Sequence, residues 1–125
     1  MHLISSITIA VALAGTAQAS TPAGEATAAS PGSAEAAVLK CHQEYARRYA
    51  NRVEAAPSEI AAGAFGACKQ QMDAFEAQVP ELAKADERVA IGLGDAQATE
   101  REIVARFRDD VRNATIDAVI RSRSP

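Results

Sequence analysis

Apolar residues recur every three or four positions along most of this 125-residue chain. That spacing is the period of one face of an α-helix. The first such stripe predicts a helix over residues 35–55, followed by a break at Pro57 and a helix cap from Ser58. Its apolar members are Val38, Cys41, Tyr45, Tyr49 and Val53. No stretch alternates apolar and polar residues as a half-buried strand does, so the pattern favours helices throughout.

Three further segments continue this pattern. One stripe predicts a helix over 59–79 that ends at Pro80, and a weaker one suggests a helix over 81–91, although the pattern leaves open whether the segment 81–98 holds a stable helix. The residues from Thr99 to Glu102 match a capping box and predict the start of the last helix. We therefore expect an all-α protein, a small antiparallel helical bundle of three to four helices.

The beginning of the chain does not fit the helical stripes. Residues 1–19 combine an apolar stretch with a closing Ala-Gln-Ala, the small residues that signal peptidase recognises, so we expect a cleaved signal peptide. The apolar stretch is shorter than the roughly 20 residues that span a bilayer, and no membrane span remains after cleavage. Residues 20–34 are rich in Ala, Ser and Pro, a composition typical of a disordered tether. The helical domain is then expected over 35–125.

Composition narrows the possible functions. The net charge of −3 gives no basic surface for nucleic acid, which is therefore not expected as a partner. The chain is alanine-rich, has no tryptophan, and uses arginine more than lysine, which indicates a bacterial protein from a GC-rich genome. Small side chains bury little apolar area, and each Å² contributes only about 25 cal/mol. A covalent link would therefore matter for the stability of this domain.

Cys41 and Cys68 are the two cysteines of the chain. An even number of cysteines in an exported protein favours a disulfide, because the compartment outside the cytoplasm is oxidising. If the chain reverses direction near residues 54–57, both cysteines lie at similar distances from the bend and on stripes that face each other. We therefore expect a disulfide-linked helical hairpin rather than catalytic or metal-binding thiols.

Candidate chemistry is sparse. His42 is the one histidine beyond the leader, and we expect it to be half-exposed beside the apolar stripe. Haem attachment needs a C-x-x-C-H motif, which the residues before His42 do not form, and a zinc site needs about four nitrogen, sulfur or oxygen ligands. No cofactor and no metal site are therefore expected. With no histidine to pair with a serine and no carboxylate couple in an apolar setting, an enzyme is not expected either.

One helix face could still bind a small ligand. Tyr45, Arg48, Tyr49 and Arg52 fall within about a third of the helix circumference. Guanidinium groups and tyrosine rings in that arrangement could hold a carboxylate, a phosphate or a glycan. The alternative is that the tyrosine rings form the edge of the core while the arginines pair with neighbouring glutamates, which is the commoner arrangement in helical proteins.

The last helix carries a second candidate surface. Ile116, Val119 and Ile120 point away from its main apolar stripe, so either a second side of the fold covers them or they form a patch for a protein partner or for self-association. These features favour a non-enzymatic interaction or chaperone-like module, periplasmic or secreted. The design resembles the helical-hairpin chaperones of the bacterial envelope-stress response, but their L-T-x-x-Q motifs are absent, so no site residues follow from it. A small-ligand or metal-binding helical bundle that uses the Tyr/Arg face is the alternative.

Overall fold

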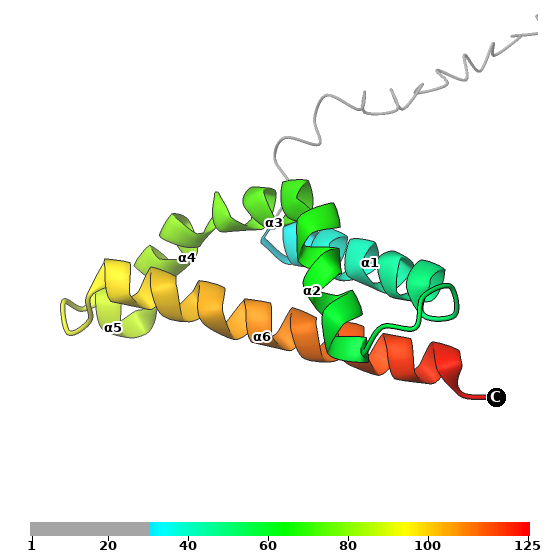
Figure 1. Ribbon diagram of the computed structural model, residues 1–125. Coiled ribbons are helices and arrows are strands. Elements are labelled where there is room, and N and C mark those ends of the chain that lie inside the picture. The colour runs from blue at the N-terminus through cyan, green and yellow to red at the C-terminus, as the bar shows by residue number, and fades with distance from the viewer. Residues whose placement is uncertain (1–30) are drawn as a thin grey trace, which may run out of the picture.

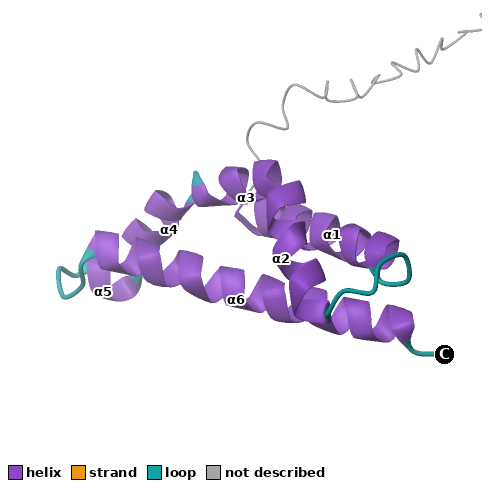
Figure 2. Cartoon of the chain, in the orientation of Figure 1, coloured by secondary structure: helices purple, strands orange, loops and turns teal. Residues whose placement is uncertain are grey.

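The computed structural model describes residues 31–125, so the predicted signal peptide and most of the predicted tether lie outside the described residues. Within the described part of the chain, every regular element is a helix, which confirms the all-α prediction (Figures 1 and 2). The helices are α1 (Pro31–Tyr49), α2 (Pro57–Ala67), α3 (Lys69–Glu76), α4 (Val79–Ala85), α5 (Glu87–Ala90) and α6 (Ala96–Arg123).

The helices form three successive segments, which we call legs: α1, the return leg from α2 to α5, and α6. The chain reverses direction from each leg to the next. α1 and α6 are parallel, because His42 meets Thr115 and Ala50 meets Arg123 at the same sequence separation of 73. The return leg from α2 to α5 is antiparallel to α6, since α2 packs on the second half of α6 and α4 on the first half. The molecule is therefore a small antiparallel helical bundle, as expected, with a middle leg broken into short helices (Figure 2).

The middle leg bends at Cys68. The prediction of one helix over 59–79 was wrong, because Cys68 has non-helical dihedrals of φ −103° and ψ 20° and separates α2 from α3. Figure 1 shows α2 crossing α6 steeply, whereas α3 and α4 follow a different direction. The bend allows one leg to place Ile60 at one end of the bundle and Phe75 at the other, which a straight helix crossing at that angle could not do.

The first helix is displaced from the predicted range of 35–55. α1 begins at Pro31, so the last residues of the predicted tether form its first turn, and Ala34 is buried. Proline suits this position because the first helical residue needs no backbone N–H. α1 ends at Tyr49, and Val53, which we expected on the apolar stripe, lies in the following loop with 42% of its surface exposed.

The helix starts use other caps than the sequence suggested. Ser58 lies inside α2, and the N–H of Ala56 is bonded instead by a carboxylate oxygen of Glu59 at 3.0 Å. The capping box at Thr99 was also wrong. α6 begins after Asp95, whose carboxylate accepts a backbone N–H of the first turn, while the Thr99 hydroxyl donates to the Asp95 carbonyl at 2.9 Å. Aspartate is the stronger cap, so the helix starts one turn earlier.

The uncertain third segment is helical in two pieces. Pro80 does not simply end a helix, since it occupies the first turn of α4, where a missing N–H costs nothing. Asp86 separates α4 from α5, and its carboxylate accepts two backbone N–H groups of α5. Gly92 then adopts φ +78°, a conformation that favours glycine, and turns the chain toward α6.

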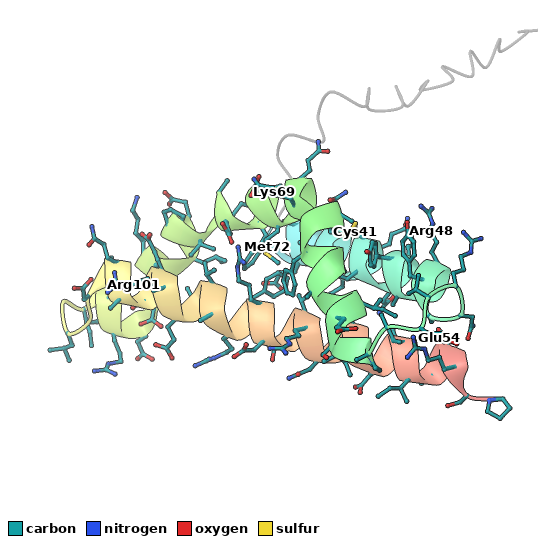
Figure 3. All side chains as sticks on the ribbon, in the orientation of Figure 1. Cys41, Arg48, Glu54, Lys69, Met72 and Arg101 are labelled. Atoms are coloured by element: carbon teal, nitrogen blue, oxygen red, sulfur yellow. A yellow bond between two sulfur atoms is a disulfide. The ribbon has the colours of Figure 1, made fainter. Side chains whose placement is uncertain are left out.

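Side chains pack into two core clusters. The aromatic cluster comprises Ala34, Val38, Met72, Phe75, Val79 and Val111, with Phe107 packed against it. The alanine cluster comprises Ala46, Ala50, Ile60, Ala118 and Val119, with Tyr45 and Tyr49 packed against it. Figure 3 shows the Met72 side chain on the inner side of α3. Both clusters therefore join all three legs, at opposite ends of the bundle.

Candidate functional site

The disulfide is formed as predicted. Cys41 and Cys68 are bonded, with a Cα–Cα separation of 5.9 Å, and the bond joins α1 to the bend of the return leg (Figure 3). Cys68 is completely buried and Cys41 is partly exposed. No free cysteine is present in the described residues, so no thiol chemistry is offered there. The bond closes the hairpin at the position where the two core clusters meet.

The residues of the predicted Tyr/Arg face lie in different surroundings. Tyr45 and Tyr49 stack with ring centroids 4.5 Å apart and cover the alanine cluster, as the core-edge alternative expects. Arg48 points outward (Figure 3) and shares with Tyr45 a hollow of about 200 Å³ beside the disulfide. Arg52 lies beyond the end of α1, in a separate depression. Within residues 31–125 neither arginine forms an ion pair, so the expected pairing with glutamates is not found.

The apolar patch on the last helix is largely covered. Val119 is fully buried in the alanine cluster, so its assignment to an exposed patch was wrong. Ile116 is half-buried, and Ile120 alone of the three is exposed, at 50%. The physical reason is that α1 and α2 cover two sides of this part of α6. Isolated exposed apolar side chains are common on protein surfaces, so the three residues do not form the continuous apolar patch that was expected.

His42 is not half-exposed as expected, because it is buried with 1% of its surface exposed. Its ring meets Phe65 edge to face at 4.7 Å between centroids, and its Nδ1 lies 3.2 Å from the Thr115 hydroxyl. The Thr115 hydroxyl donates its own proton to the carbonyl of Val111 at 2.6 Å. His42 Nε2 is buried without a hydrogen-bond partner, and burial lowers the pKa of this imidazole.

A sequence signal for this burial existed. The buried positions in α1 and directly after it recur every four residues, and His42 stands in that series: Ala34, Val38, His42, Ala46 and Ala50. The predicted stripe ran through Cys41 and the tyrosines, which are bulkier than alanine, and was therefore centred beside the true buried face. Where an alanine-rich helix packs closely, alanine marks the core side as well as larger residues do.

An apolar groove that the sequence did not reveal lies between α4 and the first half of α6. It has a volume of about 480 Å³. Its apolar lining is Val79, Pro80, Val104 and Ala105, and its charged rim is Glu76, Glu100, Arg101 and Arg108. Arg108 donates to Glu76 across the legs at 2.5 and 3.2 Å, which leaves the other two charges outside any ion pair within residues 31–125. The groove was missed because α4 was the least certain helix of the sequence.

A second depression, of about 320 Å³, lies over the rings of Phe75 and Phe107. Four carboxylates line it; of these, Asp86 caps α5 and Glu102 pairs with Arg106 at 2.7 Å. Over residues 31–125, no cluster of histidine, cysteine and carboxylate side chains could hold a metal ion.

Comparison with known proteins adds no assignment. No family model matches the sequence, and neither the curated proteins nor the solved structures contain a significant match. In the described part of the chain, every helix is too short or too polar to cross a membrane. The disulfide together with this finding is compatible with an extracellular or periplasmic protein.

Proposed function

We propose that this chain is a non-enzymatic, chaperone-like interaction module, and that the α4–α6 groove binds apolar side chains of another polypeptide. The observation that carries the proposal is the composition of the groove, an apolar floor inside a rim of charged side chains. Protein interfaces have this anatomy, with an apolar centre that excludes water and a polar rim that stays solvated.

The rim argues for a partner with little net charge. Glu76 and Arg108 neutralise each other, and Glu100 and Arg101 offer one charge of each sign. A strongly acidic or strongly basic partner would be attracted by one of these side chains and repelled by the other. The favoured occupant is therefore a short aliphatic segment with mixed or few charges.

The helices around the groove determine how that segment binds. Helices satisfy their backbone groups internally, so α4 and α6 offer no strand edge to which a peptide could add. Binding then depends on side chains that enter the groove. Such binding tolerates many sequences, which is what a chaperone-like module needs for clients that expose apolar residues.

The compartment and the absence of catalysis are part of the same proposal. The disulfide and the leader-like residues 1–19 support a periplasmic or secreted bacterial protein. A non-enzymatic role is supported by His42, which lies in the core and is therefore out of reach of a substrate.

The test uses Ala105→Glu, which places a charge on the apolar floor at an exposed helical position. Ala74→Glu on α3 is the matched control, because it makes the same change at an exposed position outside the groove. The measurement is light scattering of heat-unfolded citrate synthase with increasing amounts of each protein. We expect the natural protein and Ala74→Glu to suppress scattering and Ala105→Glu to lose at least about tenfold in effective concentration, the factor that corresponds to 1.4 kcal/mol.

Three results would overturn the proposal. The natural protein could fail to suppress scattering, or both variants could lose suppression equally, which would show that the groove is not the binding surface. Sedimentation could instead show that the natural protein forms a dimer that Ala105→Glu dissociates, which would make a second copy the occupant of the groove.

A further inference from the structure

The hydrogen bonds around His42 determine which of its ring nitrogens carries the proton. The Thr115 hydroxyl has a single proton, and the Val111 carbonyl accepts it at 2.6 Å. In the 3.2 Å contact between Thr115 and His42, the hydroxyl oxygen must therefore accept, and Nδ1 must donate. The neutral imidazole carries its proton on Nδ1, and Nε2 keeps a lone pair that no donor meets within the described part of the chain.

We propose that His42 is a pH-sensitive switch of the bundle: protonation of Nε2 loosens the packing of α6 on the hairpin of α1 and α2. A proton on Nε2 would create a buried N–H donor and a positive charge with no acceptor beside it. An unpaired buried donor costs free energy, and an unpaired buried charge costs more. The group regains a partner only when water reaches it, and water reaches it only when helices separate.

The disulfide determines which helix separates. α1 and the return leg are joined by Cys41 and Cys68, so they remain together at any pH at which the bond persists. Apart from the backbone loop that joins α5 to α6, no covalent link in the described part of the chain holds α6 to either leg. It contacts the histidine through Thr115, and its contacts around that residue are non-covalent packing. Opening therefore moves α6 away from the α1–α2 pair.

The charged groups around the imidazole do not provide the missing acceptor. On α6, Arg108 lies on the same face as Thr115, and its guanidinium is 5.9 Å from the centroid of Phe65, which opposes a second positive charge. On α1, the nearest carboxylate on the same face is Glu35, two turns away, at about 10 Å along the helix. The acidic and basic residues of α2 and α3 comprise Glu59, Lys69, Asp73 and Glu76, each bonded to another partner.

The direction of the pH effect follows from the protonation states. Burial lowers the pKa of His42 below the ordinary value of 6.5, so in mild acid the unfolded or open chain binds a proton that the closed bundle does not. The contribution of neutral His42 to the free energy of unfolding is present above the ordinary pKa of 6.5, and it is lost as the pH falls toward the lower pKa of the folded state. The equilibrium constant for opening then rises by up to about tenfold for each pH unit in that window.

The sequence makes this effect easy to assign. The chain has two histidines, and the other one, His2, lies in the predicted leader. A pH-dependent change between pH 6.5 and pH 5 that disappears when His42 is replaced therefore reports on His42.

The test combines a titration and a variant. In the natural protein, the NMR signal of the His42 ring should titrate with a pKa below 6.5, and the unfolding equilibrium constant in urea should rise between pH 7 and pH 5. His42→Phe keeps an aromatic ring but cannot titrate, so this rise should be absent, whatever the stability of the variant at pH 7. Three results would overturn this proposal: a ring pKa at or above 6.5, an unfolding equilibrium constant of the natural protein that does not change with pH, or the same pH dependence of that constant in His42→Phe.

Amide hydrogen exchange locates the opening and does not depend on the variant. At pH 5.5, after correction for intrinsic exchange rates, the amides of α6 near Thr115 should lose protection before those of α1 and α2 near the disulfide. Uniform loss of protection over all helices would show that acid unfolds the domain as a whole, and the assignment of α6 as the moving element would be wrong.

Discussion

The two ends of the bundle are held together by different means. The aromatic cluster brings large side chains into contact, with the rings of Phe75 and Phe107 only 4.0 Å apart between centroids. The alanine cluster contains Ile60 and Val119 among alanines, so each contact there buries less apolar area. At the alanine end, α1 and α6 approach each other on small side chains, so burial of apolar area stabilises their association less than at the aromatic end. Another kind of interaction must therefore contribute to their association there.

Polar contacts supply that contribution at the alanine end. The Arg123 guanidinium, near the end of α6, donates to the carbonyls of Ala50, Val53 and Ala55 at 2.6, 3.1 and 2.7 Å. Asn51 donates to the carbonyl of Ser122 at 3.1 Å. These bonds satisfy the carbonyls left free where α1 ends, and they join the C-terminal ends of α1 and α6. Among residues 31–125, Glu76 and Arg108 form an ion pair across the aromatic end at the surface, rather than a network like that of Arg123.

The largest effect is expected from Phe75→Ala, which removes a fully buried ring from the aromatic cluster. Loss of a buried phenylalanine costs about 3–5 kcal/mol, through lost transfer energy and the cavity that remains. Urea unfolding of the variant and of the natural protein measures it. Phe107→Ala, at a half-buried ring of the same pair, should cost less. If Phe75→Ala costs under about 1 kcal/mol, this end is not held by apolar packing.

Removal of the disulfide should affect both ends, because it lies between them. The double variant Cys41→Ala and Cys68→Ala opens a loop with a sequence separation of 27, for which the chain-entropy relation gives about 3.5 kcal/mol. Thermal and urea unfolding of the variant and of the natural protein measure the difference. A loss much smaller than this would indicate that the reduced hairpin keeps its structure when the rest of the chain unfolds.

Arg123→Gln tests the polar contacts of the alanine end directly. The variant loses a charged donor to three carbonyls, and hydrogen bonds to charged groups contribute about 1.5–3 kcal/mol where they are desolvated. Because Arg123 is partly exposed, we expect a loss of about 1–2 kcal/mol in urea unfolding. Arg121→Gln, two residues away and exposed, is the control and should stay within about 0.5 kcal/mol. Equal effects of the two substitutions would remove the contrast between the ends.

The smallest expected effect distinguishes two glycines of α2. Gly66→Ala meets no atom within 4 Å and should stabilise the helix by about 0.5–1 kcal/mol. At Gly63, an added Cβ would lie 2.6 Å from the Tyr45 hydroxyl oxygen, so Gly63→Ala should gain less or lose stability. Adding Tyr45→Phe should restore the gain in a double-mutant cycle. If the two glycine variants behave alike without it, the tyrosine does not pack tightly over α2.

The candidate site was predictable only in part. The spacing of the two cysteines about the chain reversal was enough to predict the disulfide, because both stood on helical stripes at similar distances from the bend. The groove was not predictable, because its floor combines α4, a weakly patterned segment, with one side of α6. The burial of His42 was missed because the predicted stripe was centred on Cys41 and the tyrosines, beside the buried series to which His42 belongs.

What the sequence determined by itself was local: the helical period, the approximate position of the break at Pro57, and the number of thiols that could pair. Each of these depends on a few neighbouring residues and on the rigid geometry of the backbone. The tertiary structure alone decided that the middle leg bends at Cys68, that Val119 is covered, and that Nε2 of His42 has no partner. These features depend on which surfaces of distant segments meet, and a helix that offers apolar or small side chains on more than one side does not specify in advance which side that will be.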